Sequence, residues 1–197
     1  MKKIAIIGAS KHDRIFLAQT LSYLTGYEII RQTAYPIQAI KYGFNRELTK
    51  CNWRELFLYL FSSFSERIEV EQKCEHYISN GSVFNELANM EAIVDLSVCS
   101  KREKKEQKYI IAGMRKIITE YANKEYDCII HKFINPQNSS NLSVNIDIIL
   151  DELSINCEKV YHINEESVLT DILEIIITNP KISPRLALEK AKKDIYK

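Results

Sequence analysis

Short apolar runs that end at turn residues recur along the chain, and they predict a parallel sheet. The first run, Ile4 to Ile7, is continuous and rich in isoleucine, and it stops at Gly8. Such a run is typical of a strand buried on both faces of a parallel sheet. Similar runs at 27–30, around Ile78, at 127–133 and at 159–163 predict further strands. We therefore expect about five short strands.

Stretches with apolar residues at helical spacing separate these strands. The first, from Ile15 to Leu24, ends at Gly26, which has the position of a helix C-cap. Asn52 and Glu55 form a capping-box pattern before a long apolar stripe. The same spacing predicts further helices at 85–96, 101–121, 145–155, 167–177 and 183–196. Long helical crossovers between strands predict a three-layer α/β/α sandwich with a mostly parallel, about five-stranded sheet, formed by residues 1–197 as one domain.

Composition and charge exclude several classes of protein. The 27 lysines and arginines nearly balance the 26 aspartates and glutamates, so we expect neither a nucleic acid nor a membrane surface as a partner. Five cysteines without a CxxC pair suggest neither a disulfide framework nor a zinc knuckle. The apolar run near the N-terminus is too short for a signal peptide or a membrane span. We therefore expect a cytoplasmic protein.

The turn after the first strand has the layout of a phosphate-binding loop, because ligands of parallel sheets bind at the carboxyl ends of the strands. Such a loop has the form GxxxxGK[ST], in which backbone amides and a lysine hold phosphates and a hydroxyl holds Mg²⁺. Asp13 replaces the second glycine, Arg14 the lysine and Ile15 the hydroxyl residue. The full window is Gly8, Ala9, Ser10, Lys11, His12, Asp13, Arg14 and Ile15. The window therefore predicts a phosphate-site scaffold with altered charges.

The same turn also aligns with the dinucleotide-binding pattern GxxGxxG, with Lys11 and Arg14 in place of the second and third glycines. A Rossmann protein that binds NAD(P) is therefore an alternative. The order of the strands distinguishes the two: a kinase-like sheet places the Ile78 strand beside the first strand, whereas a Rossmann sheet places the strand at 27–30 there.

The order of the elements and the segment YISNGSVFNELA, residues 77–88, resemble the P-loop nucleoside and nucleotide kinase-like proteins. The resemblance is greatest to the ATPase and kinase group related to nicotinamide-riboside kinases. It implies a lysine and a hydroxyl residue in the first loop, an acidic base after the second strand, an aspartate after the third strand and arginines in a lid. The matching positions hold Arg14, Ile15, Gln32 and Asn80, and the stretch that matches the lid, 135–144, contains no arginine or lysine.

These replacements fall on the groups that carry phosphoryl transfer, which depends on positioning and on charge stabilisation. At the degenerate catalytic positions Arg14, Gln32 and Asn80, the resemblance implies a pseudoenzyme that binds a nucleotide or regulates a partner. ATP or another nucleotide would be the ligand, and Mg²⁺ would bind only if the protein is active. The alternative is a divergent but active nucleotide kinase or NTPase, in which Lys11 or Arg14 replaces the usual lysine. A nucleoside ligand, a protein partner and a homo-oligomer all remain open.

The four histidines predict no metal site from their spacing. His12 is interpreted as a turn residue and His131 as a strand residue with satisfied hydrogen bonds. His76 and His162 lie far apart along the chain.

Overall fold

A five-stranded, all-parallel sheet forms the centre of the protein in the computed structural model, which describes residues 3–31, 51–95, 100–134, 139–155, 157, 159–163 and 166–195. The spatial order of its strands is β2-β3-β1-β4-β5. The strands are β1 (Lys3–Ile7), β2 (Glu28–Arg31), β3 (Tyr77–Asn80), β4 (Cys128–Lys132) and β5 (Val160–Ile163). The expected parallel sheet is therefore confirmed. β3 lies beside β1, which is the arrangement expected of the kinase-like sheet and not of the Rossmann alternative.

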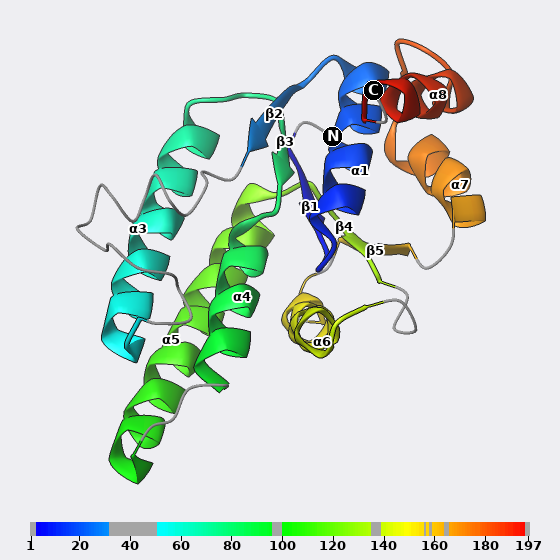
Figure 1. The fold of residues 1–197 in the computed structure, drawn as a ribbon. Helices are drawn as coiled ribbons and strands as arrows, with labels where there is room; N and C mark the ends of the chain where they lie inside the picture. Colours follow the sequence, from blue (N-terminus) through cyan, green and yellow to red (C-terminus); the bar gives the residue numbers. More distant parts are fainter. Residues whose placement is uncertain are drawn as a thin grey trace.

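Helices cover both faces of this sheet, so the molecule has three layers (Figure 1). One face packs against α1 (Lys11–Thr25), α7 (Glu166–Ile176) and α8 (Pro184–Ile195). The other face packs against α3 (Trp53–Gln72), α4 (Val83–Asp95), α5 (Lys101–Glu125) and α6 (Asn141–Ser154). Among the described helices, none combines the length and the apolar character that crossing a bilayer requires.

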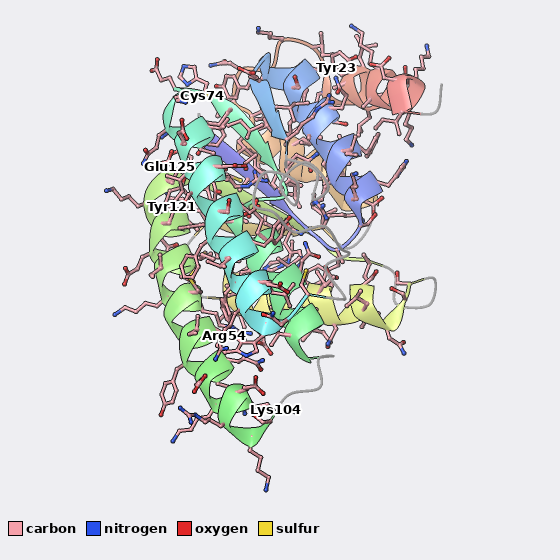
Figure 2. All side chains as sticks on the ribbon, turned by 60° about the vertical axis from the view of Figure 1, so that its left-hand side comes forward. Tyr23, Arg54, Cys74, Lys104, Tyr121 and Glu125 are labelled. Carbon is pink, nitrogen blue, oxygen red and sulfur yellow. The ribbon has the colours of Figure 1, made fainter. Side chains whose placement is uncertain are left out.

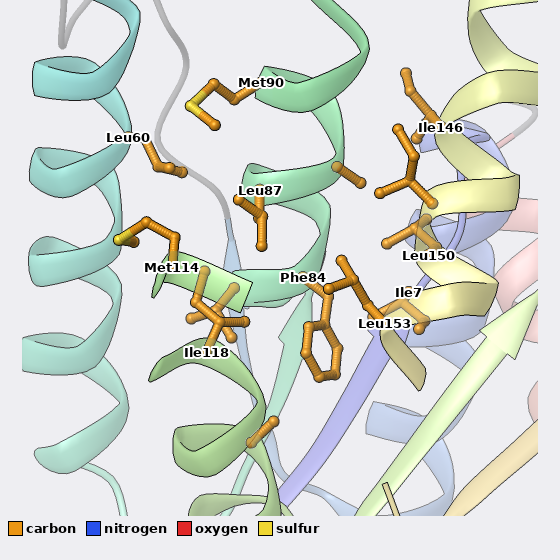
Figure 3. Close-up of a cluster of buried hydrophobic side chains, with 14 of the residues drawn as sticks. Ile7, Leu60, Phe84, Leu87, Met90, Met114, Ile118, Ile146, Leu150 and Leu153 are labelled. Atoms are coloured by element: carbon orange, nitrogen blue, oxygen red, sulfur yellow. The ribbon is translucent and has the colours of Figure 1, made fainter. Parts of the chain in front are cut away.

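The larger of the two cores is organised around α4. Phe84 and Leu87 are fully buried on this helix, and Met90 nearly so. Figure 3 shows Leu87 and Met90 on the side of α4 that faces Leu60 of α3, while Leu150 of α6 lies on the other side of the helix. Burial of each such side chain stabilises the fold by about 1.5–3 kcal/mol. α4 therefore anchors α3, α5 and α6 to the sheet.

Two helices, α1 and α6, begin about one turn earlier than the sequence pattern indicates. α1 begins at Lys11, because Ser10 is its N-cap and the Oγ of Ser10 accepts a hydrogen bond of 3.2 Å from the amide of Asp13. α6 begins at Asn141 because Ser140 caps it in the same way. Lys11 to Arg14 are thus helical and do not form a turn. Only three residues, Gly8 to Ser10, connect β1 to α1.

Candidate functional site

The connection after β1 lies at the carboxyl edge of the sheet, and it begins at a glycine that no other residue could replace without strain. Gly8 has a φ of 153°, and a Cβ atom added there would lie 2.5 Å from the carbonyl oxygen of Lys132 in β4. The β3 turn is joined to the same place, since the amide of Gly81 donates a 3.0 Å hydrogen bond to the carbonyl of Ile6. This edge of the sheet is therefore closely packed backbone against backbone.

The carbonyl oxygen of Gly8 accepts hydrogen bonds from both sides of the sheet. From α1, the Nη1 atom of Arg14 donates to it, and from α4 the Nδ2 atom of Asn85 donates to it at 2.8 Å. Both donors are buried, Arg14 with 6% of its surface exposed. The side chain of Arg14 therefore turns back onto the loop and fixes its conformation.

The positive charge of Arg14 is incompletely compensated. Burial, and then the charge of nearby Arg67, lower the pKa of its guanidinium from 12.5 to about 10, while Asp13 opposes the shift. The Nε atom of Arg14 is buried and has no hydrogen-bond partner in the part of the chain that the structure describes. The group still carries its proton at neutral pH, and an anion beside it would compensate the cost of burying the charge.

A pocket of about 270 Å³ opens beside Arg14, between α1 and the ends of β2 and β3. Among the described residues that line it, three are cationic and none is acidic. Arg31 and Asn80 end adjacent strands and are register partners, so both reach the pocket from the sheet. The described lining consists of Lys11, Arg14, Ile15, Ala18, Gln19, Ile29, Arg31 and Asn80. With the N-terminus of α1 also at this edge, the pocket suits a small anionic group.

A buried polar network supports β3 from the opposite face of the sheet. Arg67 of α3 donates from Nε to Glu86 and from Nη1 to Ser79, both at 2.9 Å. Ser79 in turn donates a 2.5 Å hydrogen bond to Glu71. Burial raises the pKa of Glu86, while Arg67 opposes this shift. Burial alone would lower the pKa of Arg67, but Glu86, Tyr126 and Glu71 outweigh it and hold that pKa above its ordinary value.

Two tyrosines complete the network around the carboxylate of Glu71. Tyr121 donates to Glu71 at 2.7 Å and Tyr126 at 3.1 Å. Figure 2 shows Tyr121 on the part of α5 that runs beside α3, where its ring contacts Phe64 edge to face. Burial, followed by the charge of Glu71, raises the pKa of both tyrosines. The network thus provides Arg67 with two carboxylates, whereas Arg14 has none at contact distance among the described residues.

The structure brings some of the residues expected from sequence together and separates others. Lys11, Arg14, Ile15 and Asn80 line one pocket. Gly8 and Ser10 shape the loop, and Ala9 packs into the core. His12 and Asp13 are not among the lining residues; they form an exposed pair at 3.7 Å. Gln32 lies outside the described residues, as do 135–138 of the expected lid.

Three residues of this region were not anticipated: Arg31, Arg67 and Asn85. Arg31 could have been found, because it ends a strand at the edge where ligands of parallel sheets bind. Arg67 and Asn85 lie within helices, and only the packing of those helices against β1 and β3 gives them their roles.

Comparison with known proteins shows that the fold of this chain is similar to that of a solved structure. Neither family models nor curated protein sequences match the chain. Among solved structures, deoxyadenosine kinase from M. mycoides with bound dATP is similar, with a TM-score of 0.62 over 90% of this chain and 100% of that one. The sequence identity is 13%. The likeness shows that this chain shares the fold of that kinase, and it does not single out the group related to nicotinamide-riboside kinases.

Proposed function

We propose that this protein binds a nucleotide through its phosphate groups at the cationic pocket, and that it does not transfer phosphate efficiently. It would then act as a binding or regulatory protein built on a kinase fold. The observation that carries the proposal is the composition of the pocket, whose described lining contains Lys11, Arg14 and Arg31 and no acidic residue. The pocket, at about 270 Å³, is suited in size to a phosphate-bearing part of a ligand.

The state of Arg14 favours an anion as the ligand. Its guanidinium is buried, that burial lowers its pKa, and its Nε has no hydrogen-bond partner among the residues that the structure describes. A phosphate at the pocket would add charge-assisted hydrogen bonds, which are about twice as strong as neutral ones. The bound dATP of the similar deoxyadenosine kinase favours a nucleotide among the possible anions.

The lack of efficient transfer follows from what the pocket does not offer. Mg²⁺ takes oxygen ligands, usually a carboxylate or a hydroxyl together with the phosphates. Asn80 presents an amide and Ile15 a hydrocarbon at the positions that the family resemblance assigns to an aspartate and a hydroxyl residue. The alternative of an active kinase would need Arg14 to stabilise the phosphate as it is transferred, and the hydrogen bond from Nη1 to Gly8 leaves only part of the guanidinium for that role.

Calorimetric titration of the full chain tests the binding. Inorganic phosphate, pyrophosphate, nucleosides and nucleoside triphosphates are compared, each with and without Mg²⁺. We expect phosphate-bearing compounds to bind and nucleosides to bind more weakly, with an affinity that falls as salt is added. Lys11→Gln and Arg31→Gln change exposed side chains, and each is expected to reduce affinity about tenfold. Arg102→Gln, at a side chain 89% exposed on α5, is the matched control.

Two results would contradict the proposal. Phosphate-bearing compounds that fail to bind, or that bind equally well to both pocket variants, would remove the pocket as the site. Measurable transfer of phosphate from ATP to a nucleoside, lost in Arg14→Ala, would establish the active kinase instead.

A further inference from the structure

A cluster of two histidines and two aspartates lies on the face of the sheet opposite the cationic pocket. His131 of β4 and His162 of β5 are register partners on adjacent parallel strands. Asp147 and Asp151 stand four residues apart on α6, so they share the face of that helix which packs over the strands. The two histidines lie 31 positions apart along the chain, and the pairing of β4 with β5 brings them together.

His131 is held in one orientation and keeps one nitrogen available. Its side chain is fully buried, and its Nε2 lies 3.2 Å from Oδ1 of Asp147. The other oxygen of Asp147 accepts a 3.1 Å hydrogen bond from the amide of Ile134. Asp147 can therefore accept a hydrogen bond from Nε2–H of His131, and in that tautomer the lone pair of Nδ1 is available to a ligand. That Nδ1 atom is buried and has no hydrogen-bond partner among the described residues.

The other two members of the cluster lie close to His131 and are half-exposed. Nδ1 of His162 lies 4.0 Å from Oδ1 of Asp151, and the two side chains are 43% and 46% exposed. One ligand atom from each of His131, His162 and Asp151 can be chosen so that all lie within 4.8 Å of one another. The ring of Phe133 packs against both imidazoles: its centroid lies 4.0 Å from the ring centroid of His131 and 5.4 Å from that of His162.

We propose that His131, His162 and Asp151 form a binding site for a divalent transition-metal ion of the zinc class. Two imidazole nitrogens and one carboxylate oxygen are the donor set that such ions prefer, whereas Mg²⁺ and Ca²⁺ prefer oxygen alone. Asp147 supplies the carboxylate that orients His131 through its second ring nitrogen, Nε2, as is usual for metal-binding histidines. Three protein ligands leave a fourth, solvent-facing position for water.

The distances require a small adjustment that the cluster can make. Ligand atoms about 2.0–2.2 Å from a tetrahedral ion lie roughly 3.3–3.6 Å from one another. The cluster must therefore contract by at most about 1.5 Å, and the half-exposed side chains of His162 and Asp151 are free to move by this amount on rotation.

Such an ion would join α6 to the edge strand β5. β5 pairs only with β4 in the described sheet. A link between Asp151 and His162 would hold the helix and the edge strand together, and binding to the folded state alone would raise the melting temperature.

The test uses the full chain, free of any affinity tag and freed of metal with a chelator. Zn²⁺ is titrated calorimetrically, and Co²⁺ serves as a spectroscopic probe. We expect one Zn²⁺ per chain, and a visible Co²⁺ spectrum without the near-ultraviolet charge-transfer band that thiolate ligands give. His162→Ala and Asp151→Asn are each expected to reduce affinity at least about tenfold. His12→Ala, which removes another exposed histidine, is the matched control.

Asp147→Asn tests the orienting hydrogen bond, and its expected effect is a loss of affinity of about tenfold with the Co²⁺ spectrum retained. A failure to bind one equivalent, binding that His162→Ala leaves unchanged, or a thiolate charge-transfer band would each overturn the proposal. These outcomes do not depend on nucleotide binding at the cationic pocket.

Discussion

Arg14 and Gly8 form the contact that fixes the loop after β1. The guanidinium of Arg14, in the first turn of α1, donates to the carbonyl of Gly8, and Asn85 donates to the same oxygen. The loop is thus held from within by a buried cation. Because the second donor remains when the first is removed, the structural and the electrostatic contributions of Arg14 can be separated.

Arg14→Met separates these two contributions. The substitution keeps much of the buried volume and removes a charge whose burial already lowers its pKa, while Asn85 still satisfies the Gly8 carbonyl. We expect the free energy of unfolding to change by less than about 1.5 kcal/mol. Phosphate affinity should fall at least about tenfold. Urea unfolding and calorimetry measure the two effects, and a loss of more than about 3 kcal/mol would show that the guanidinium is mainly structural.

Gly8→Ala tests the close approach of the loop to β4. The added methyl group would meet the carbonyl oxygen of Lys132 at 2.5 Å, in a backbone conformation that side chains rarely adopt. We expect destabilisation of roughly 2–4 kcal/mol from overpacking and strain. Gly113→Ala is the matched control, since nothing lies within 4 Å of its added Cβ, and in the interior of α5 it should stabilise by about 0.5–1 kcal/mol. Equal effects of the two substitutions on the melting temperature would refute the packing argument.

Arg67→Met tests the buried network beneath β3. The substitution leaves the carboxylates of Glu86 and Glu71 buried without their cation, and we expect a loss of about 3–5 kcal/mol. The double variant with Glu86→Gln should recover part of this loss, because one buried charge is removed. The exposed Arg102→Met should change stability by less than about 0.5 kcal/mol. If Arg67→Met is as mild as this control, the network does not hold the fold together.

The strands were predicted well because their signals are local. Ile4 to Ile7 is an apolar run that needs no distant residue to be recognised, and the capping box at Asn52 and Glu55 is present as expected. The predicted start of the first helix, at Ile15, was wrong for a different reason. The phosphate-loop pattern predicts a turn that extends from Gly8 to Ile15. Ser10, followed three residues later by Asp13, is however itself a signal for the start of a helix, and α1 does begin at Lys11.

The remaining features depend on packing that no local pattern records. Phe61 belongs to the apolar stripe of α3, yet its side chain is 45% exposed because it lies at the edge of that stripe. Arg67 stands among charged residues of α3 and is nevertheless buried, since Ser79 and Glu86 approach it from β3 and α4. His131 and His162 become neighbours only through the register of β4 and β5.

The start of α5 offers a test of pH dependence with a definite sign. Ser100 and Glu103 form a capping box there, in which the Ser100 hydroxyl donates to Oε2 of Glu103 at 2.7 Å and the Ser100 amide at 3.0 Å. These two hydrogen bonds, in that order, lower the pKa of Glu103 below its ordinary value of 4.5, and a contact with the indole of Trp53 adds to them.

A carboxyl group whose pKa is lowered on folding stabilises the folded state above its unfolded pKa, and this stabilisation is lost as the pH falls through the folded value. We therefore expect Glu103→Gln to lower stability near neutral pH and to lose its effect as the pH falls below about 4.5. Thermal unfolding between about pH 7 and about pH 3 measures the difference between variant and wild type. Repeating Glu103→Gln in a Ser100→Ala background is the control, since the pH dependence of the difference should become smaller once the main donor is gone. A difference that stays constant across this range would mean that the capping box contributes through shape and not through the charge of Glu103.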